Sequence, residues 1–174
     1  MTRFTDAGPS AMFLARASGT YGSTTTLTAI LTSGNTPLAN KSISFNLNGI
    51  SVGTATTTPK GIAILTNVSL AGLNAGTYSS GIAATFAGDS TYQGKVAAAP
   101  LIVSRAAASV TPEAASKIFG DADPIPLTIG TLTGFVARDA VTAAYARTPG
   151  KSPGTYPISA TLGPAAVLSN YEIT

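Results

Sequence analysis

Apolar and polar residues alternate along several short segments of the chain. In residues 42–48, Ile43, Phe45 and Leu47 occupy every second position and polar side chains stand between them. Successive side chains of a β-strand point to opposite faces, so this period of two predicts a strand with one face in a core and the other in water.

A hairpin is predicted directly after this strand. Asn48-Gly49 tolerates the positive φ values of a type I′ turn, and the alternating residues 50–56 follow it. Residues flanking an Asn-Gly pair in this way are typical of two antiparallel strands.

Residues 78–86 repeat the alternation, and further strands are predicted at residues 12–17, 25–32, 61–66 and 96–103. Short strands at this spacing, separated by turns, favour an all-β chain that begins with an immunoglobulin-like β-sandwich of about seven strands over residues 10–104. Its predicted core includes Ile43, Phe45, Leu47, Tyr78, Ile82 and Phe86.

A boundary is predicted near Ser104-Arg105-Ala106, because the last strand of the first part ends at Val103 and a Pro-rich composition begins at Pro112. Residues 106–174 are therefore predicted to form a second small β-rich module. Its size is close to the limit at which one core stabilises a domain. Residues 138–141 could form one helical turn, but longer helices are disfavoured because Pro112 interrupts the Ala-rich stretch. The strands predicted here are residues 128–135, 141–147, 155–162 and 167–174.

The composition excludes most catalytic chemistry. The sequence contains no His and no Cys, which removes the Ser-His-Asp triad, the thiol nucleophile, the usual zinc sites and haem or iron–sulfur ligation. The seven acidic residues show no pair at a spacing typical of a hydrolase. We therefore expect no enzyme, no catalytic residues and no cofactor.

Charge and hydropathy argue against two classes of partner. The net charge is +3, but the ten Lys and Arg residues are scattered singly instead of forming the basic stripe typical of nucleic-acid binding. No apolar run approaches the roughly 18 residues of a membrane-spanning helix, so membrane insertion is not expected. Residues 1–6 lack the apolar core of a signal peptide, so we expect either that the protein is not exported by that route or that the chain is a fragment of a longer exported protein.

Two short acidic segments could hold Ca²⁺. Asp121-Ala122-Asp123 offers two hard oxygen ligands, and Asp89 lies in a similar Gly-Asp-Ser segment, but neither has the further ligands of an EF-hand loop. Asp beside Gly is also ordinary turn chemistry, which is the favoured interpretation. No metal site is assigned.

The two parts of the chain share a motif built around tyrosine. Gly76-Thr77-Tyr78 is followed by Tyr92, and Gly154-Thr155-Tyr156 is followed by Tyr171. A Tyr at the entry of a sandwich strand often bonds nearby backbone through its hydroxyl while its ring packs inside, so core packing is the first interpretation. The alternative is sugar stacking by exposed members of a set comprising Tyr21, Tyr92, Tyr145 and Tyr171.

Residues 10–104 resemble a bacterial immunoglobulin-like (Big-type) repeat of large surface proteins. The segments that carry this resemblance are Tyr21-Gly22-Ser23, residues 34–39, residues 42–48, Gly76-Thr77-Tyr78 and residues 86–92. The resemblance implies a segment of a repetitive extracellular protein.

The second module resembles the MBG-type (mostly beta, glycine-rich) modules of such proteins. Residues 117–124 are similar to the Lys-x-Tyr-Gly-x-x-Asp-Pro opening of that family, with Phe119 in place of the usual Tyr. The sequence ends at Thr174, where the family is expected to continue into a closing strand. A module truncated there would keep a free sheet edge, which predicts an edge-strand dimer.

The functional expectation is a non-catalytic spacer or adhesive segment of a bacterial cell-surface or secreted protein. Its partners would be neighbouring repeats of a longer chain, with surface glycans or host cell-surface proteins as ligands of an adhesive version. A carbohydrate-binding module is the alternative, and it would use exposed aromatic rings as sugar platforms.

Overall fold

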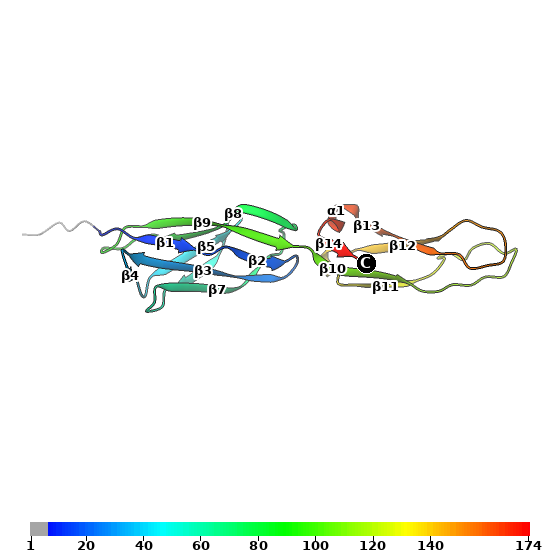
Figure 1. The fold of residues 1–174 in the computed structure, drawn as a ribbon, viewed down its shortest axis with the longest axis horizontal. Coiled ribbons are helices and arrows are strands. Elements are labelled where there is room, and N and C mark those ends of the chain that lie inside the picture. Colours follow the sequence, from blue (N-terminus) through cyan, green and yellow to red (C-terminus); the bar gives the residue numbers. More distant parts are fainter. Residues whose placement is uncertain (1–6) are drawn as a thin grey trace, which may run out of the picture. The chain divides into compact units, whose positions relative to one another are not determined.

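The computed structural model describes residues 7–174, and these divide into two compact units between Ser104 and Arg105 (Figure 1). Residues 1–6, considered above for a signal peptide, lie outside the described residues. The units are called unit 1 and unit 2 below, and each is described by itself.

Unit 1 consists of two β-sheets, as the all-β sandwich prediction requires. The four-stranded sheet contains β1 (Ala11–Leu14), β3 (Thr24–Ser33), β4 (Thr36–Pro37) and β7 (Ile62–Ser69). The five-stranded sheet has the order β2 (Ala17–Thr20), β9 (Lys95–Ser104), β8 (Gly76–Phe86), β5 (Ser42–Leu47) and β6 (Ile50–Thr56).

The core of unit 1 lies between the inward faces of these sheets. Every second residue of β5 is buried, as the alternation predicted, and Phe45 has no exposed surface. The four-stranded sheet contributes Leu14, Leu27, Ala29, Leu31, Ala63 and Val68, and the five-stranded sheet contributes Ala17, Ile43, Phe45, Leu47, Ile82, Ala84, Phe86, Ala99, Leu101 and Val103.

The predicted hairpin is confirmed. Asn48 and Gly49 have φ values of 47° and 83°, which is the left-handed geometry a type I′ turn requires, and β5 pairs antiparallel with β6. A bulge shifts the register between Phe45 and Asn46.

The single strand predicted at residues 12–17 is wrong, because the chain forms two strands there. β1 pairs antiparallel with β3, whereas β2 pairs in parallel with β9 in the other sheet. Leu14 and Ala17 are both buried, so each side of the break contributes to the core from a different sheet. With the two-residue β4, this raises the count from the predicted seven strands to nine among the described residues of unit 1.

Tyr78 is half-buried and is not one of the buried core residues, unlike the other five predicted core positions. The reason is an irregularity in β8, where the register with β9 shifts between Tyr78 and Ile82. Gly81 lies in this segment, and a Cβ there would stand 2.8 Å from the Cβ of Leu101. The bulged backbone therefore occupies the space beside Leu101.

Unit 2 is a smaller set of strands in two sheets. A three-stranded sheet has the order β11 (Gly130–Thr133), β10 (Ala106–Pro112) and β14 (Tyr171–Ile173), and a separate hairpin joins β12 (Thr142–Arg147) to β13 (Ile158–Gly163). One 3₁₀ turn, η1 (Ala137–Asp139), and one short helix, α1 (Ala165–Leu168), complete the unit.

Several sequence predictions for unit 2 need correction. The central strand β10 was not predicted, and residues 167–174 form the end of α1 followed by the short β14 instead of one strand. β13 begins three residues after the predicted start at Thr155. The helical turn predicted near Arg138 is present as η1.

Tyr171 is the main buried aromatic residue of unit 2. Its ring lies 4.9 Å from that of Phe135, and its hydroxyl donates to the Asp139 carboxylate and accepts the N–H of Val136 at 3.0 Å. The residues of unit 2 classed as buried are Ala106, Ala108, Asp139, Asn170 and Tyr171. This small core agrees with the marginal size inferred from the sequence.

Within residues 7–174, no helix has the length and apolar character needed to cross a membrane.

Phe45→Ala should destabilise the chain by about 3–5 kcal/mol, because the ring is fully buried and its removal leaves a cavity. Phe13→Ala is the matched control, since 64% of the Phe13 side chain is exposed. Urea denaturation followed by circular dichroism measures both variants. An F45A midpoint equal to that of F13A would contradict the assignment of the core.

Candidate functional site

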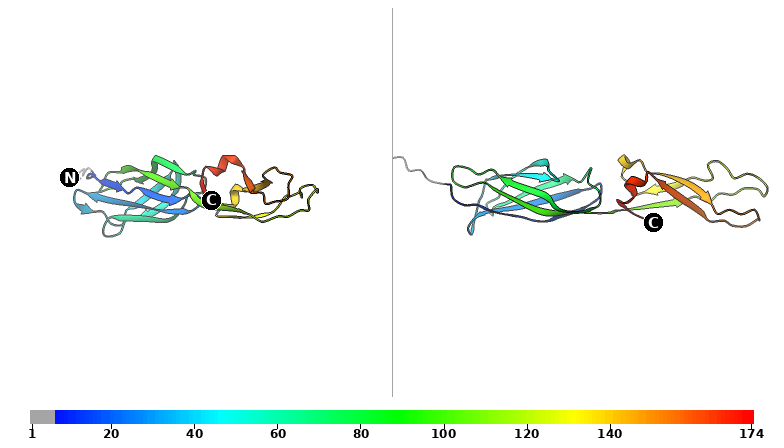
Figure 2. Two further views of the ribbon diagram at one scale, coloured as in Figure 1. Left: turned by 45° about the vertical axis from the view of Figure 1, so that its right-hand side comes forward. Right: turned by 90° about the horizontal axis from the view of Figure 1, so that it is seen from above.

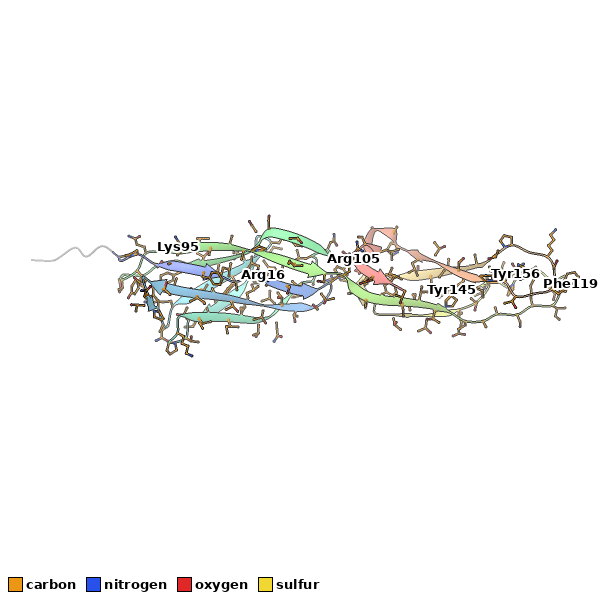
Figure 3. The ribbon with its side chains drawn as sticks, in the orientation of Figure 1. Arg16, Lys95, Arg105, Phe119, Tyr145 and Tyr156 are labelled. Atoms are coloured by element: carbon orange, nitrogen blue, oxygen red, sulfur yellow. The ribbon has the colours of Figure 1, made fainter. Side chains whose placement is uncertain are left out.

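Two long connections meet at one end of unit 2 (Figures 1 and 2). Residues 113–129 join β10 to β11, and residues 148–157 join β12 to β13. They border a hollow of about 740 Å³, and Figure 3 shows Phe119 and Tyr156 at this end. Ile118 and Phe119 are 75% and 70% exposed beside it.

A cluster of charged and aromatic side chains holds the two connections together. The Arg147 Nε lies 3.0 Å from both carboxylate oxygens of Asp123, and the Lys117 Nζ lies 3.1 Å from Asp123 Oδ1. Lys117 also donates to the backbone carbonyl of Asp121 at 2.6 Å. We call Lys117, Asp123, Arg147 and Tyr156 the loop-end cluster.

Tyr156 completes the loop-end cluster on the side of the second connection. The Arg147 guanidinium lies 5.0 Å from the centre of the Tyr156 ring, within the range of a cation–π interaction. The Tyr156 hydroxyl donates to the Ser152 carbonyl at 2.6 Å, and a Cβ at Gly150 would collide with the ring. Arg147 also donates to the carbonyls of Thr148 and Gly150, so it fixes the start of this connection.

The electrostatics of the cluster favour a structural role over acid–base catalysis. The hydrogen bond from Lys117, followed by that from Arg147, lowers the pKa of Asp123 below its usual value of 3.8. A carboxylate held in its ionised form is a poor proton donor near neutral pH. Within residues 7–174, no group of three or more acidic, His or Cys side chains is placed to hold a metal ion.

Both acidic segments considered for Ca²⁺ have turn contacts. The N–H of Asp121 donates to the Ile118 carbonyl at 3.2 Å, and the Asp123 carboxylate faces two cationic side chains. A Ca²⁺ ion at Asp123 would have to displace the Lys117 ammonium. The turn interpretation therefore accounts for the contacts that these residues make.

Asp89 forms the corresponding turn in unit 1. Its Oδ1 accepts the N–H groups of Thr91 and Tyr92 at 2.8 and 2.9 Å, and its Oδ2 lies 2.5 Å from the Lys41 Nζ. The same Lys41 ammonium lies 5.1 Å from the centre of the Tyr92 ring. Each unit thus combines an aspartate, a cationic side chain and a tyrosine ring at one loop.

The repeated Gly-Thr-Tyr motif has the same hydroxyl contact in both units. The Tyr78 hydroxyl donates to the Asn74 carbonyl at 2.9 Å, as that of Tyr156 does to Ser152, and in each case the acceptor is four residues earlier. The predicted bond to nearby backbone is confirmed, although both rings are only half-buried.

The four tyrosines considered as sugar platforms are covered to different extents. Tyr21 and Tyr171 are buried at 6% and 3% exposure. Tyr92 and Tyr145 are half-buried, and Lys41 lies over the Tyr92 ring. The set presents no pair of fully exposed rings within one unit, because each unit contributes one buried and one half-buried ring.

Sequence reasoning missed the cations of these sites. Lys41, Lys117 and Arg147 were treated as scattered charges, although each is paired with an aspartate in the folded chain. Lys117 donates to the backbone carbonyl of Asp121 but forms its ion pair with Asp123, so the spacing of four residues from Lys117 to Asp121 does not indicate that pair. Arg147 lies 24 residues from Asp123, and no local pattern indicates that pair.

Lys41→Met should raise the pKa of Asp89 from about 2 toward its ordinary value of 3.8, because the Lys41 hydrogen bond is the largest cause of the lowered value. The folded-state pKa lies below that of the unfolded chain, so ionised Asp89 stabilises the fold above pH 3.8, and this contribution disappears as the pH falls toward 2. NMR titration of the Asp89 carboxyl carbon measures the shift. Lys60→Met removes an exposed lysine from another loop and should leave the midpoint of the Asp89 titration unchanged. An equal Asp89 midpoint in K41M and in the wild-type chain would refute the assignment of Lys41 as the main cause of the lowered pKa.

One comparison with known proteins gave a match, and this match covers most of unit 2. Residues 108–174 match the family model described as MBG domain (YGX type), which confirms the MBG-type module predicted from the sequence. Neither the search of curated proteins nor that of solved structures found a match to the chain. Residues 108–174 are therefore similar to a non-catalytic β-rich module that occurs in bacterial surface proteins.

Proposed function

We propose that the chain is a non-catalytic structural segment, a spacer or adhesive stalk, of a bacterial cell-surface or secreted protein. The observation that carries the proposal is the MBG-domain match over residues 108–174. Unit 1 supports it as a β-sandwich whose spaced motifs resemble those of a Big-type immunoglobulin-like repeat. The partners would be neighbouring repeats of a longer chain, and the location would be extracellular.

Strand pairing in both units suits a segment that transmits tension. In unit 1, β2 near the beginning pairs in parallel with β9 at the end, and in unit 2 the first strand β10 pairs in parallel with the last strand β14. When the ends of such a unit are pulled apart, the hydrogen bonds between the paired strands share the force and must break together. Forced unfolding depends on this kinetic barrier more than on equilibrium stability.

Ala106→Pro should lower the force at which unit 2 unfolds, because it removes the N–H that donates to the Asn170 carbonyl at 2.9 Å. The measurement is single-molecule pulling of the whole chain from its two ends, in which each unit unfolds in a separate event. The force of the unit 1 event, which the substitution does not touch, serves as an internal standard.

Ala107→Pro is the matched control on the same strand. The backbone hydrogen bonds from β10 toward β14 and the residues flanking it, Asn170 and Thr174, are made by Ala106, Ala108 and Val110. Because alternate residues of a strand bond to the same neighbour, the Ala107 N–H points away from β14. A107P should therefore retain more of the unfolding force than A106P. Equal forces in A106P and wild type, or unfolding of both units at forces too low to detect, would contradict a role under tension.

The carbohydrate-binding alternative predicts a different result. Because Tyr21 and Tyr171 are buried, we expect a glycan array probed with the whole chain to show no saturable binding. Saturable binding that is abolished by Tyr145→Ala or Tyr92→Ala, with the fold intact by circular dichroism, would overturn a spacer role and favour the alternative.

A further inference from the structure

Strand β12 presents a regular and unpaired edge. It pairs with β13 alone, through six successive residue pairs without a bulge, from Thr142 with Gly163 to Arg147 with Ile158. The side chains along it are small except for Tyr145 and Arg147, and it contains no Pro. Such an edge offers backbone N–H and C=O groups to another extended chain.

The outer strands of unit 1 are protected by features that β12 lacks. β4 has two residues and includes Pro37, β1 and β2 have four residues each, and bulges interrupt β6 beside Gly53 and β7 beside Asn67. Short length, Pro and bulges are the means by which proteins prevent edge-to-edge pairing. β12 lacks these features, as does its partner β13, and the β12 edge differs from the β13 edge in the groove that residues 141–147 border.

A groove of about 790 Å³ follows the edge of β12. All residues from Val141 to Arg147 border it, whereas its opposite wall consists of residues 123–130, the end of the connection before β11 and the first residue of that strand. Odd- and even-numbered residues of a strand point to opposite faces of its sheet, and residues of both kinds in β12 border the groove. The groove therefore lies along the backbone edge of β12 and not over one face of its sheet. Leu132 of β11 also borders it, and Ile125 and Ile129 of the wall are 98% and 63% exposed.

The sheet that carries this edge is incompletely covered. No residue of β12 or β13 is buried, and the side chains on one face of the hairpin, including Tyr145 and Leu162, are only half-buried. An additional strand beside β12 would place its own alternate side chains next to these residues and against Ile129. Apolar side chains at every second position would therefore gain contacts on the groove side.

We propose that the groove between β12 and residues 123–130 binds an extended peptide segment of a partner protein, which pairs with β12 as an added strand. The backbone of the segment bonds to the free edge, and small or apolar side chains at alternate positions face Leu132 and Ile129. A lone strand fits better than the β12 edge of a second copy, because the second copy would bring its own β13 against the wall at residues 123–130. The inference does not depend on the spacer role.

Amide hydrogen exchange of the whole chain in the presence of a peptide tests this proposal. The peptide is the end-capped sequence of residues 158–163, which form β13 and already pair with β12 on its other edge. At saturating peptide, the β12 amides that do not bond to β13 should exchange at least about tenfold more slowly. The same peptide carrying Ala160→Pro cannot donate from its central position and should give little protection.

Ile129→Glu should weaken peptide binding by about tenfold, because it places a charge in the apolar wall. Ile64→Glu is the matched control, an exposed isoleucine of unit 1, and should bind as wild type does. Protection at β12 that requires the peptide and is reduced in I129E alone supports the proposal. No protection, protection at another edge, or protection that rises with protein concentration in the absence of peptide would overturn it, and the last result would identify a second copy as the occupant.

Discussion

Parallel pairing between an early strand and the last strand is the constraint on which each unit depends. β2 pairs with β9 in unit 1, and β10 pairs with β14 in unit 2. Parallel neighbours cannot be joined by a tight turn, so the rest of each unit forms the connection between them. The paired strands also contribute to the core, since Ala17 and Leu101 are buried in one unit and Ala106 and Tyr171 in the other. The pairing therefore couples the two ends of a unit to its hydrophobic core.

This constraint explains where sequence reasoning succeeded in unit 1 and where it failed. Alternation within one strand is a local property, so the inward face of β5 and the Asn48-Gly49 turn could be predicted. The break between β1 and β2 could not, because it depends on β9, which lies about 80 residues further along the chain. Tyr78 was misplaced for a similar reason, since the irregularity in β8 arises where Gly81 approaches Leu101 of a neighbouring strand.

Unit 2 was harder to predict because its strands depend more on pairing with neighbouring strands than on the intrinsic strand propensity of their residues. The Ala-rich β10 has no strong strand or helix preference of its own, and it becomes a strand between β11 and β14. Residues 165–168 turn into α1 after Pro164, and only three residues remain for β14. The family resemblance identified the module where local patterns did not, because motifs spaced along the whole module reflect tertiary contacts that the propensities of single segments omit.

The few charged side chains of the chain contribute to the order of its loops more than to any reactive site. Asp89 accepts two backbone N–H groups and a lysine, and Asp123 joins Lys117 to Arg147, so both carboxylates are committed to contacts within their own unit. Exposed ion pairs contribute little stability individually, but those that also bond backbone or stack on a ring restrict the conformations of a loop. A protein with sparse charge and small cores has limited means of ordering long connections. The aspartate–cation–tyrosine arrangement provides such a means at one loop of each unit, and it leaves the strand edges and apolar loop surfaces as the parts available for interaction.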